Sequence, residues 1–221
     1  DHRDLHSFPT RRSSDLEEDI HVFPIILKRA YDSPMPASEV LECKRRFGFR
    51  PEKKLLLLAG GGEGLPNGDR YLEYALKEKL NADIAIVCGR NKLLKFQADL
   101  ITKRFKNTHV KVYEFVDFMY QLMNMSDVIV TKGGPATVME ALILEKPLIL
   151  VDYIYGQEKG NVDYVVDHQA GFFIRNPKKA MEKVKSLLED PKSFEEMKRN
   201  IRSLDIRNGT EEIVDFILTR N

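Results

Sequence analysis

Short apolar runs alternate with segments of helical spacing along most of this chain. Apolar or β-branched runs begin near residues 54, 83, 110, 127, 147 and 171, and apolar residues recur at helical spacing after them. The first run is continuously apolar, which is typical of a strand buried on both faces of a parallel sheet. The pattern therefore predicts an α/β fold, a doubly wound parallel sheet of Rossmann-like type with helices on both faces.

Outside these repeats the pattern predicts a few further elements. We expect helices at 37–47, 93–105, 119–125, 177–188, 194–204 and 211–218, and the third strand at 110–115. Residues 20–36 contain three prolines and no helical period, so they predict an extended connector. Residues 1–18 are polar and aperiodic, and their run LHSFPTRRSSDL resembles a translated sequencing adapter. We expect a non-native or disordered leader there, and hence a truncated chain.

Composition narrows the class of protein. The 221 residues are 43% hydrophobic and 31% charged, with a formal net charge of +1, which suits one α/β domain with a sizeable core and gives no argument for nucleic acid. No apolar run approaches the roughly 18 to 20 residues of a membrane span. Cys43 and Cys88 are far apart and form no CxxC pattern. This usage predicts a reducing, cytoplasmic setting and no structural zinc site.

A strand-to-helix turn follows the β-branched run 127–131. Pro135 suits the first helical position because its missing N–H has no partner there anyway, and two glycines before it let a ligand approach the backbone. A helix N-terminus carries about half a positive charge and unpaired N–H groups, which favours a phosphate. The candidate phosphate ligands at this turn are Lys132, Gly133, Gly134, Ala136 and Thr137.

Further polar groups follow at spacings that suit a sugar. The side chain of Glu140 should lean back towards the helix N-terminus, where a carboxylate can accept both hydroxyls of a ribose. A second glycine turn brings Gln157 and Asn161 four residues apart, predicted on one helix face, where two carboxamides can bind sugar hydroxyls. A helix start with an early Glu and a solvated polar face are the alternatives for these residues taken singly.

Taken together, the stretch 131–161 resembles glycosyltransferase family 28, most closely its branch of monogalactosyldiacylglycerol synthases and processive diacylglycerol glucosyltransferases. The resemblance implies the C-terminal half of a GT-B glycosyltransferase, with 19–50 as interdomain connector and helix and 51–221 as the UDP-sugar-binding domain. The residues that carry the resemblance are Thr131, Lys132, Gly133, Gly134, Pro135, Thr137, Glu140, Ala141, Pro147, Gly156, Gln157, Glu158 and Asn161.

A glycine-rich loop directly follows the first predicted strand. It matches neither the G-x-G-x-x-G dinucleotide fingerprint nor the G-x-x-x-x-G-K-[ST] phosphate loop, which disfavours a dehydrogenase and a P-loop enzyme. The resemblance implies that Gly61, Gly62 and Gly64 face the donor diphosphate, whereas a tight turn is the alternative. Arg90 is a candidate for a phosphate contact or for simple solvation.

The resemblance also implies how the ligand and the reaction are arranged. Phe115 and Val116 would hold the uracil, with ordinary core packing as the alternative for Phe115; Glu140 would bind the ribose, and Gln157 and Asn161 the hexose. The expected activity is inverting transfer of a hexose from UDP-galactose, UDP-glucose or UDP-N-acetylglucosamine to a lipid, with diacylglycerol as the expected acceptor.

The resemblance places no catalytic residue in this fragment, because the base belongs to the missing N-terminal domain, through which the lipid acceptor would also bind. We expect no cofactor and no metal, and leave open a peripheral membrane contact of the full-length protein. The alternatives are a UDP-sugar 2-epimerase of the same fold and a non-catalytic UDP-binding module.

Overall fold

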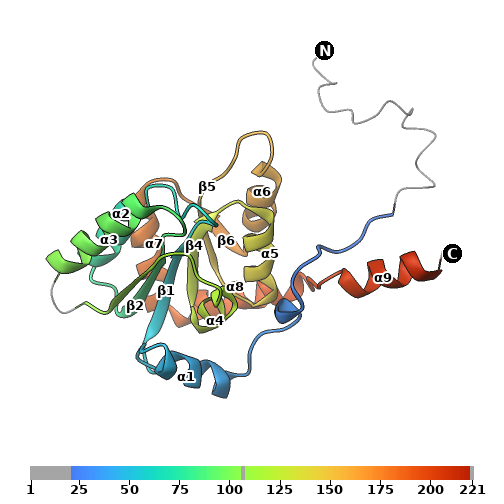
Figure 1. Ribbon diagram of the computed structural model, residues 1–221, viewed down its shortest axis with the longest axis horizontal. Coiled ribbons are helices and arrows are strands. Elements are labelled where there is room, and N and C mark those ends of the chain that lie inside the picture. Colours follow the sequence, from blue (N-terminus) through green and yellow to red (C-terminus); the bar gives the residue numbers. More distant parts are fainter. Residues whose placement is uncertain (1–20, 106–107, 220–221) are drawn as a thin grey trace, which may run out of the picture.

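The fold is built on one parallel sheet. A computed structural model describes residues 21–105 and 108–219 (Figure 1); the proposed leader at 1–18 lies outside these residues. The strand order is β3-β2-β1-β4-β5-β6, and every neighbouring pair is parallel. This confirms the predicted doubly wound sheet. The strands are β1 (Lys54–Ala59), β2 (Ala82–Val87), β3 (Val110–Tyr113), β4 (Val128–Lys132), β5 (Leu148–Asp152) and β6 (Gly171–Phe173).

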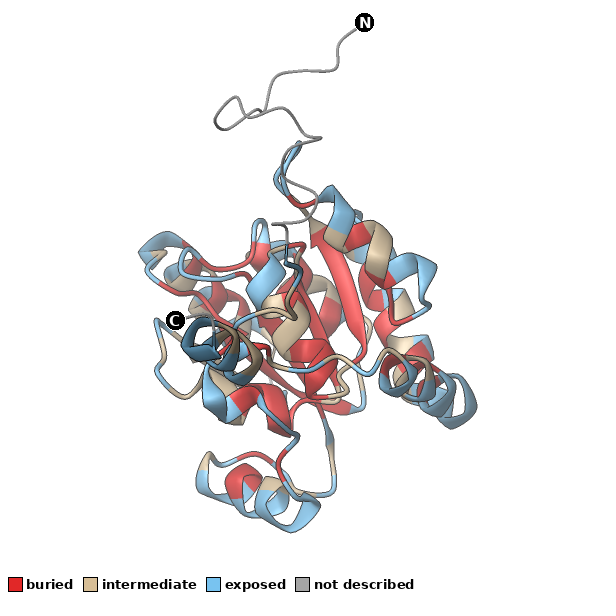
Figure 2. Cartoon of the chain, turned by 90° about the vertical axis from the view of Figure 1, so that its right-hand side faces the viewer, coloured by how far each residue is buried: buried red, intermediate tan, exposed pale blue. Residues whose placement is uncertain are grey.

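The sheet is buried on both faces, which explains its continuous apolar runs. In the central strand β1, Leu55, Leu56, Leu57 and Leu58 are fully buried. Figure 2 shows the buried residues concentrated in the strands and in the helix faces that cover them. A strand covered on both faces has no solvated side to alternate towards, so its sequence loses the two-residue period.

Helices cover the two faces of the sheet in separate groups. Helices α2 (Gly68–Lys77), α3 (Lys92–Arg104) and α7 (Pro177–Glu189) lie on one face, whereas α4 (Met119–Met125), α5 (Pro135–Ile143) and α6 (Lys159–Asp167) lie on the other (Figure 1). The adjacent strands β1 and β4 are therefore followed by helices on opposite faces. This is the topological switch point, where the ends of parallel strands leave a crevice for ligands.

The remaining helices lie outside these layers. Helix α1 (Ala37–Arg46) packs against α4, and α8 (Pro191–Ser203) packs against α7 and α5. Helix α9 (Thr210–Thr219) projects from the body of the molecule and buries none of its residues (Figure 1). Its Phe216 ring meets the ring of Phe23 edge-on at 5.1 Å between centroids. The segment that was expected to be an extended connector therefore lies against the last helix, with one short 3-10 turn, η3 (Arg29–Tyr31).

The expected helices are all present, with ends shifted by a few residues. The prediction of a strand to residue 115 was wrong, because β3 ends at Tyr113 and the chain then bends, leaving Phe115 60% exposed. Alternation of apolar and polar residues continues past the last paired residue and so does not mark the strand end.

Candidate functional site

The switch point holds a hollow of about 310 Å³ at the carboxyl ends of the strands. Its floor is formed by Leu57, Ala59 and Ile129 of the two central strands. Loops after β1 and β2 and the start of α5 form its walls. Seven residues predicted from the sequence line it together: Gly61, Gly62, Phe115, Val116, Ala136, Thr137 and Glu140.

The start of helix α5 presents free backbone donors to this hollow. Gly134 is the N-cap in an extended conformation, Pro135 is the first helical residue, and no side chain among the described residues caps the helix. The Gly133 N–H donates instead to Asp152 O at 2.8 Å. Ala136 and Thr137 line the hollow at the positive end of the helix dipole, where an anion is stabilised.

Lys132 lies beside this helix start, but its ammonium already has a partner. Its Nζ is 3.0 Å from Oε1 of Glu158, whose residue is only 6% exposed. The other oxygen, Oε2, accepts the backbone N–H of Ile154 at 2.8 Å. The sequence assigned a role to Lys132 and not to Glu158. The signal was available, because the turns after two neighbouring parallel strands carry opposite charges that meet at one edge of the sheet.

The glycine loop after β1 divides between the hollow and the core. Gly61 and Gly62 line the hollow, whereas Gly64 is buried with φ +74°. A Cβ at Gly64 would lie 2.6 Å from the carbonyl oxygen of Cys88. Gly64 therefore serves close packing against the turn after β2 and does not join the other predicted phosphate ligands.

Arg90 and Phe115 form a pair at the rim. The Arg90 guanidinium lies over the Phe115 ring at 5.0 Å, and the Arg90 N–H donates to Gly62 O at 2.8 Å. Phe115 is exposed beside the hollow, so the alternative of ordinary core packing for this residue is wrong. Val116 lies next to it and is half-buried. An exposed aromatic ring next to a hollow offers a face on which a planar base can stack.

Glu140 is half-buried and faces the hollow from the second turn of α5. Burial raises the pKa of its carboxyl, and the nearby Lys28 opposes that shift. Lys28 and Tyr31 of the connector also line the hollow, which sequence reasoning missed. Tyr31 is buried and its hydroxyl lies 3.8 Å from Met123 Sδ, while burial and the charge of Glu140 raise its pKa. The signal for Tyr31 was weak, because the segment that contains it also carries Phe23 and several aliphatic residues.

The two carboxamides lie outside the lining of the hollow, Gln157 on the turn after β5 and Asn161 in the first turn of α6. The prediction that Gln157 and Asn161 share a helix face was wrong, because α6 begins at Lys159 and Gln157 belongs to the preceding turn. Gln157 is exposed. Asn161 donates from Nδ2 to Gly133 O at 2.8 Å, so this side chain connects the two glycine turns and keeps Oδ1 for another donor.

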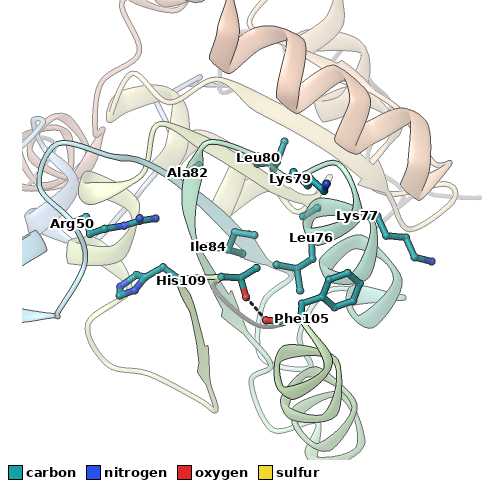
Figure 3. A pocket seen from close by; sticks show the side chains of 11 residues that line it. Arg50, Leu76, Lys77, Lys79, Leu80, Ala82, Ile84, Phe105 and His109 are labelled. Carbon is teal, nitrogen blue, oxygen red and sulfur yellow. Dashed lines mark hydrogen bonds between the residues drawn. The ribbon is translucent and has the colours of Figure 1, made fainter.

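A larger hollow, of about 580 Å³, lies at the opposite, amino-terminal ends of the strands, beside the start of β2 (Figure 3). Its lining comes from the end of α2, from β2 and from the segment around Phe105 and His109, and includes none of the predicted site residues. Its polar groups serve the fold: Arg50 Nε donates to Asp83 at 2.7 Å, and His109 Nε2 is 2.8 Å from Gly48 O. Size alone does not identify the site here.

Among residues 21–105 and 108–219, no helix is long and apolar enough to cross a membrane. The same residues contain no group of three or more His, Cys, Asp or Glu side chains arranged to hold a metal ion.

A parallel sheet with free helix donors and a carboxylate around one crevice at its switch point defines an α/β domain of the nucleotide-binding class. The family model described as the glycosyltransferase family 28 C-terminal domain matches residues 69–213. The chain belongs to glycosyltransferase family 28, which confirms the resemblance seen in the sequence.

Known proteins similar to the chain include two curated relatives and one solved structure. The processive diacylglycerol beta-glucosyltransferase of Bacillus licheniformis is 29% identical over 202 residues, which is 91% of this chain and 52% of that protein. The chloroplastic monogalactosyldiacylglycerol synthase 3 of Arabidopsis thaliana is 42% identical over 171 residues, 73% of this chain and 35% of that protein. The chain thus spans about half the length, or less, of the curated relatives it matches.

The crystal structure of WaaG, a glycosyltransferase involved in lipopolysaccharide biosynthesis, has a TM-score of 0.67 at 18% identity. The alignment covers 91% of this chain and 57% of that one. At this identity the likeness concerns the fold alone, and it confirms the predicted Rossmann-like α/β fold.

Proposed function

We propose that this chain is the donor-binding part of an inverting glycosyltransferase that transfers a hexose from a UDP-sugar to the hydroxyl of a lipid. One observation carries the proposal: backbone donors of α5, a carboxylate at Glu140 and an exposed ring at Phe115 surround one hollow at the switch point. These are the groups that a diphosphate, a ribose and a planar base require.

The diphosphate would lie at the start of α5. The Ala136 and Thr137 amides and the helix dipole supply positive potential there, with Gly61 and Gly62 also lining the hollow. The Lys132 ammonium lies outside the lining but close to Gly134 and adds to this potential. In the transfer reaction, negative charge develops on the departing UDP. Preorganised donors aimed at this charge stabilise the transition state without covalent chemistry. We propose that this electrostatic stabilisation is the contribution of the chain to catalysis, and that no metal is needed for it.

The remaining parts of the donor follow from the diphosphate position. Uracil would stack at Phe115 and Val116, with the Arg90 guanidinium on the other face of the Phe115 ring. The ribose hydroxyls would donate to Glu140. The hexose would extend towards the turn after β5, where Gln157 is exposed and Asn161 keeps one amide oxygen. Galactose, glucose and N-acetylglucosamine all fit this description of the donor.

The acceptor is proposed from the relatives. Both curated relatives are named for transfer to diacylglycerol or for its galactosylated product, which supports diacylglycerol as the acceptor class and disfavours the epimerase alternative. We propose that the general base and the acceptor surface belong to the part of these relatives that this chain does not span. The full-length protein would then meet its lipid acceptor at the membrane surface.

Titration of the chain with UDP, uridine, UDP-glucose, UDP-galactose and UDP-N-acetylglucosamine tests the donor site. We expect weak binding of every uracil nucleotide, and about tenfold weaker binding after Glu140→Ala, because hydrogen bonds to a charged group contribute about 1.5–3 kcal/mol. Glu182→Ala is the matched control, since Glu182 is an exposed carboxylate on the distant α7. An unchanged affinity in Glu140→Ala overturns the ribose assignment, and hexose transfer by the chain alone overturns the placement of the base.

A further inference from the structure

Glu158 is a buried carboxylate in a turn where an exposed polar residue is the norm. Its side chain is 8% exposed, and both oxygens are used: Oε1 pairs with Lys132 Nζ and Oε2 accepts the Ile154 N–H. The Glu158 N–H donates back to Ile154 O at 3.0 Å, so the turn closes on itself. A buried charge persists only where it is paired and hydrogen-bonded, as this one is.

The same carboxylate joins the turn after β4 to the turn after β5. Three contacts cross this boundary: Lys132 Nζ to Glu158, Gly133 N–H to Asp152 O, and Asn161 Nδ2 to Gly133 O. Only the first of them reaches a charged group that can act on a ligand. The position of the Lys132 ammonium therefore depends on the turn after β5, although Lys132 itself belongs to β4.

The Lys132 ammonium lies between the turn after β4, which contains Gly134, and the glycine loop after β1, which contains Gly61. Lys132 Nζ is 3.7 Å from the place where a Cβ at Gly134 would stand, and Lys132 Cε is 4.0 Å from that place at Gly61. A lysine side chain that lacks a partner distributes over many rotamers, and ordering it costs up to about 2 kcal/mol. An ammonium has three donors, so pairing with Glu158 leaves two for a ligand.

We propose that Glu158 is a positioning residue for the donor diphosphate. It holds the Lys132 ammonium between the turn after β4 and the glycine loop after β1, with two N–H groups left for the phosphate oxygens. This inference rests on the proposed binding of a UDP-sugar. Glu158 does not touch the ligand. Its effect on affinity passes through Lys132 alone.

The sign of the effect separates this role from simple charge. Removing a negative charge near a bound diphosphate strengthens binding by Coulomb's law. The positioning role predicts the opposite for Glu158→Gln, because a Gln amide offers one acceptor to two donors and turns its NH₂ towards either Lys132 or Ile154. Glu63→Gln is the matched control: Glu63 is an exposed carboxylate in the Gly61–Gly64 loop, and its loss changes the charge without touching Lys132.

The experiment is a double-mutant cycle read with two ligands. The wild-type chain, Glu158→Gln, Lys132→Met and the double variant are each titrated with UDP and with uridine, followed by NMR shifts. We expect Glu158→Gln to weaken UDP binding about tenfold while uridine binding stays unchanged, and to have no further effect on UDP in the Lys132→Met background. Uridine binding also verifies that each variant is folded. Glu158→Asp, which keeps the charge but is too short to bridge both donors, should give an intermediate loss.

Each other outcome overturns the inference. Equal weakening of UDP and uridine would make Glu158 a general structural residue, and a continued loss in the Lys132→Met background would mean that it acts by itself. Unchanged UDP affinity in Glu158→Gln removes the positioning role and leaves the proposed function intact. A wild-type chain that binds UDP no better than uridine removes the diphosphate site, and the role of Glu158 with it.

Discussion

The side-chain amide of Asn208 holds both backbone groups of Leu27. Its Oδ1 accepts the Leu27 N–H at 3.0 Å, and its Nδ2 donates to Leu27 O at 3.0 Å and to Asp32 at 2.7 Å. The Gly209 N–H adds a bond to Ile25 O at 2.9 Å. Two segments about 180 residues apart in the sequence are thereby joined. Because Lys28 follows Leu27 directly and lines the hollow, this joint also places one wall of the candidate site.

Replacing Asn208 by Ala should therefore destabilise the chain. Truncation leaves the half-buried Leu27 N–H without its partner and the Leu27 C=O with only a long bond of 3.5 Å from the Thr210 hydroxyl, and an unsatisfied buried group costs about 1–3 kcal/mol. The free energy of unfolding, measured by urea denaturation, should fall by that amount. Asn200→Ala is the control, because the exposed Asn200 amide makes one long bond of 3.4 Å to Gln169 O. Equal losses in the two variants would contradict the structural role of Asn208.

The fold could be predicted from the sequence as far as a doubly wound parallel sheet, because strands buried on both faces have continuously apolar sequences. The run Leu55 to Leu58 indicated a strand buried on both faces of a parallel sheet, and the helix start at Pro135 was marked by its residue types. Strand ends were harder to predict, as Tyr113 shows, since pairing stops where the neighbouring strand β2 ends and not where the apolar pattern does.

The residues of the candidate site could be predicted where they follow a strand end or a helix start, as Phe115, Thr137 and Glu140 do. The amides of Ala136 and Thr137 follow from a glycine turn and a helix. Contacts between side chains distant in sequence, such as Lys132 with Glu158 or Tyr31 with the hollow, depend on how the turns and the connector pack. Gln157 was placed on a helix because spacing alone does not show where a helix begins.

Two glycines with similar positive φ angles should respond differently to alanine. Gly64 has φ +74° and Gly156 has φ +78°, so each Ala variant pays the cost of a left-handed conformation, about 1–2 kcal/mol. At Gly156 nothing lies within 4 Å of the added Cβ, whereas at Gly64 the Cβ meets Cys88 O at 2.6 Å. Gly64→Ala should therefore lower the free energy of unfolding by clearly more than Gly156→Ala. Equal losses in the two variants would show that close packing at Gly64 does not matter.

A half-buried lysine should make stability depend on pH in the alkaline range. Lys146 Nζ donates to Asn124 O at 2.8 Å, and burial lowers its pKa from 10.5 to about 8, opposed by Asp127. Between these two values the unfolded chain binds more protons than the folded one, so folding gains stability as pH rises.

Lys146→Met removes this dependence. The difference in unfolding free energy between wild type and Lys146→Met should shift in favour of wild type as pH rises from 8 towards 10.5, by up to about 3 kcal/mol in total. Taking the difference cancels the titration of the buried tyrosines, which is common to both proteins. Urea denaturation at several pH values measures it, and a difference independent of pH would contradict the lowered pKa.

Uridine binding should weaken as pH falls through the pKa of Glu140. Burial raises that pKa above its ordinary value of 4.5, and the ribose hydroxyls need the ionised carboxylate as acceptor. Uridine carries no phosphate, so no ligand group titrates between pH 7.5 and 4.5. We expect the wild-type Kd to be independent of pH near neutrality and to increase on acidification before the pH reaches 4.5. In Glu140→Gln the Kd should be higher throughout and independent of pH over the same range. A wild-type Kd as flat as that of the variant would separate Glu140 from the ribose, even if UDP still binds at the start of α5.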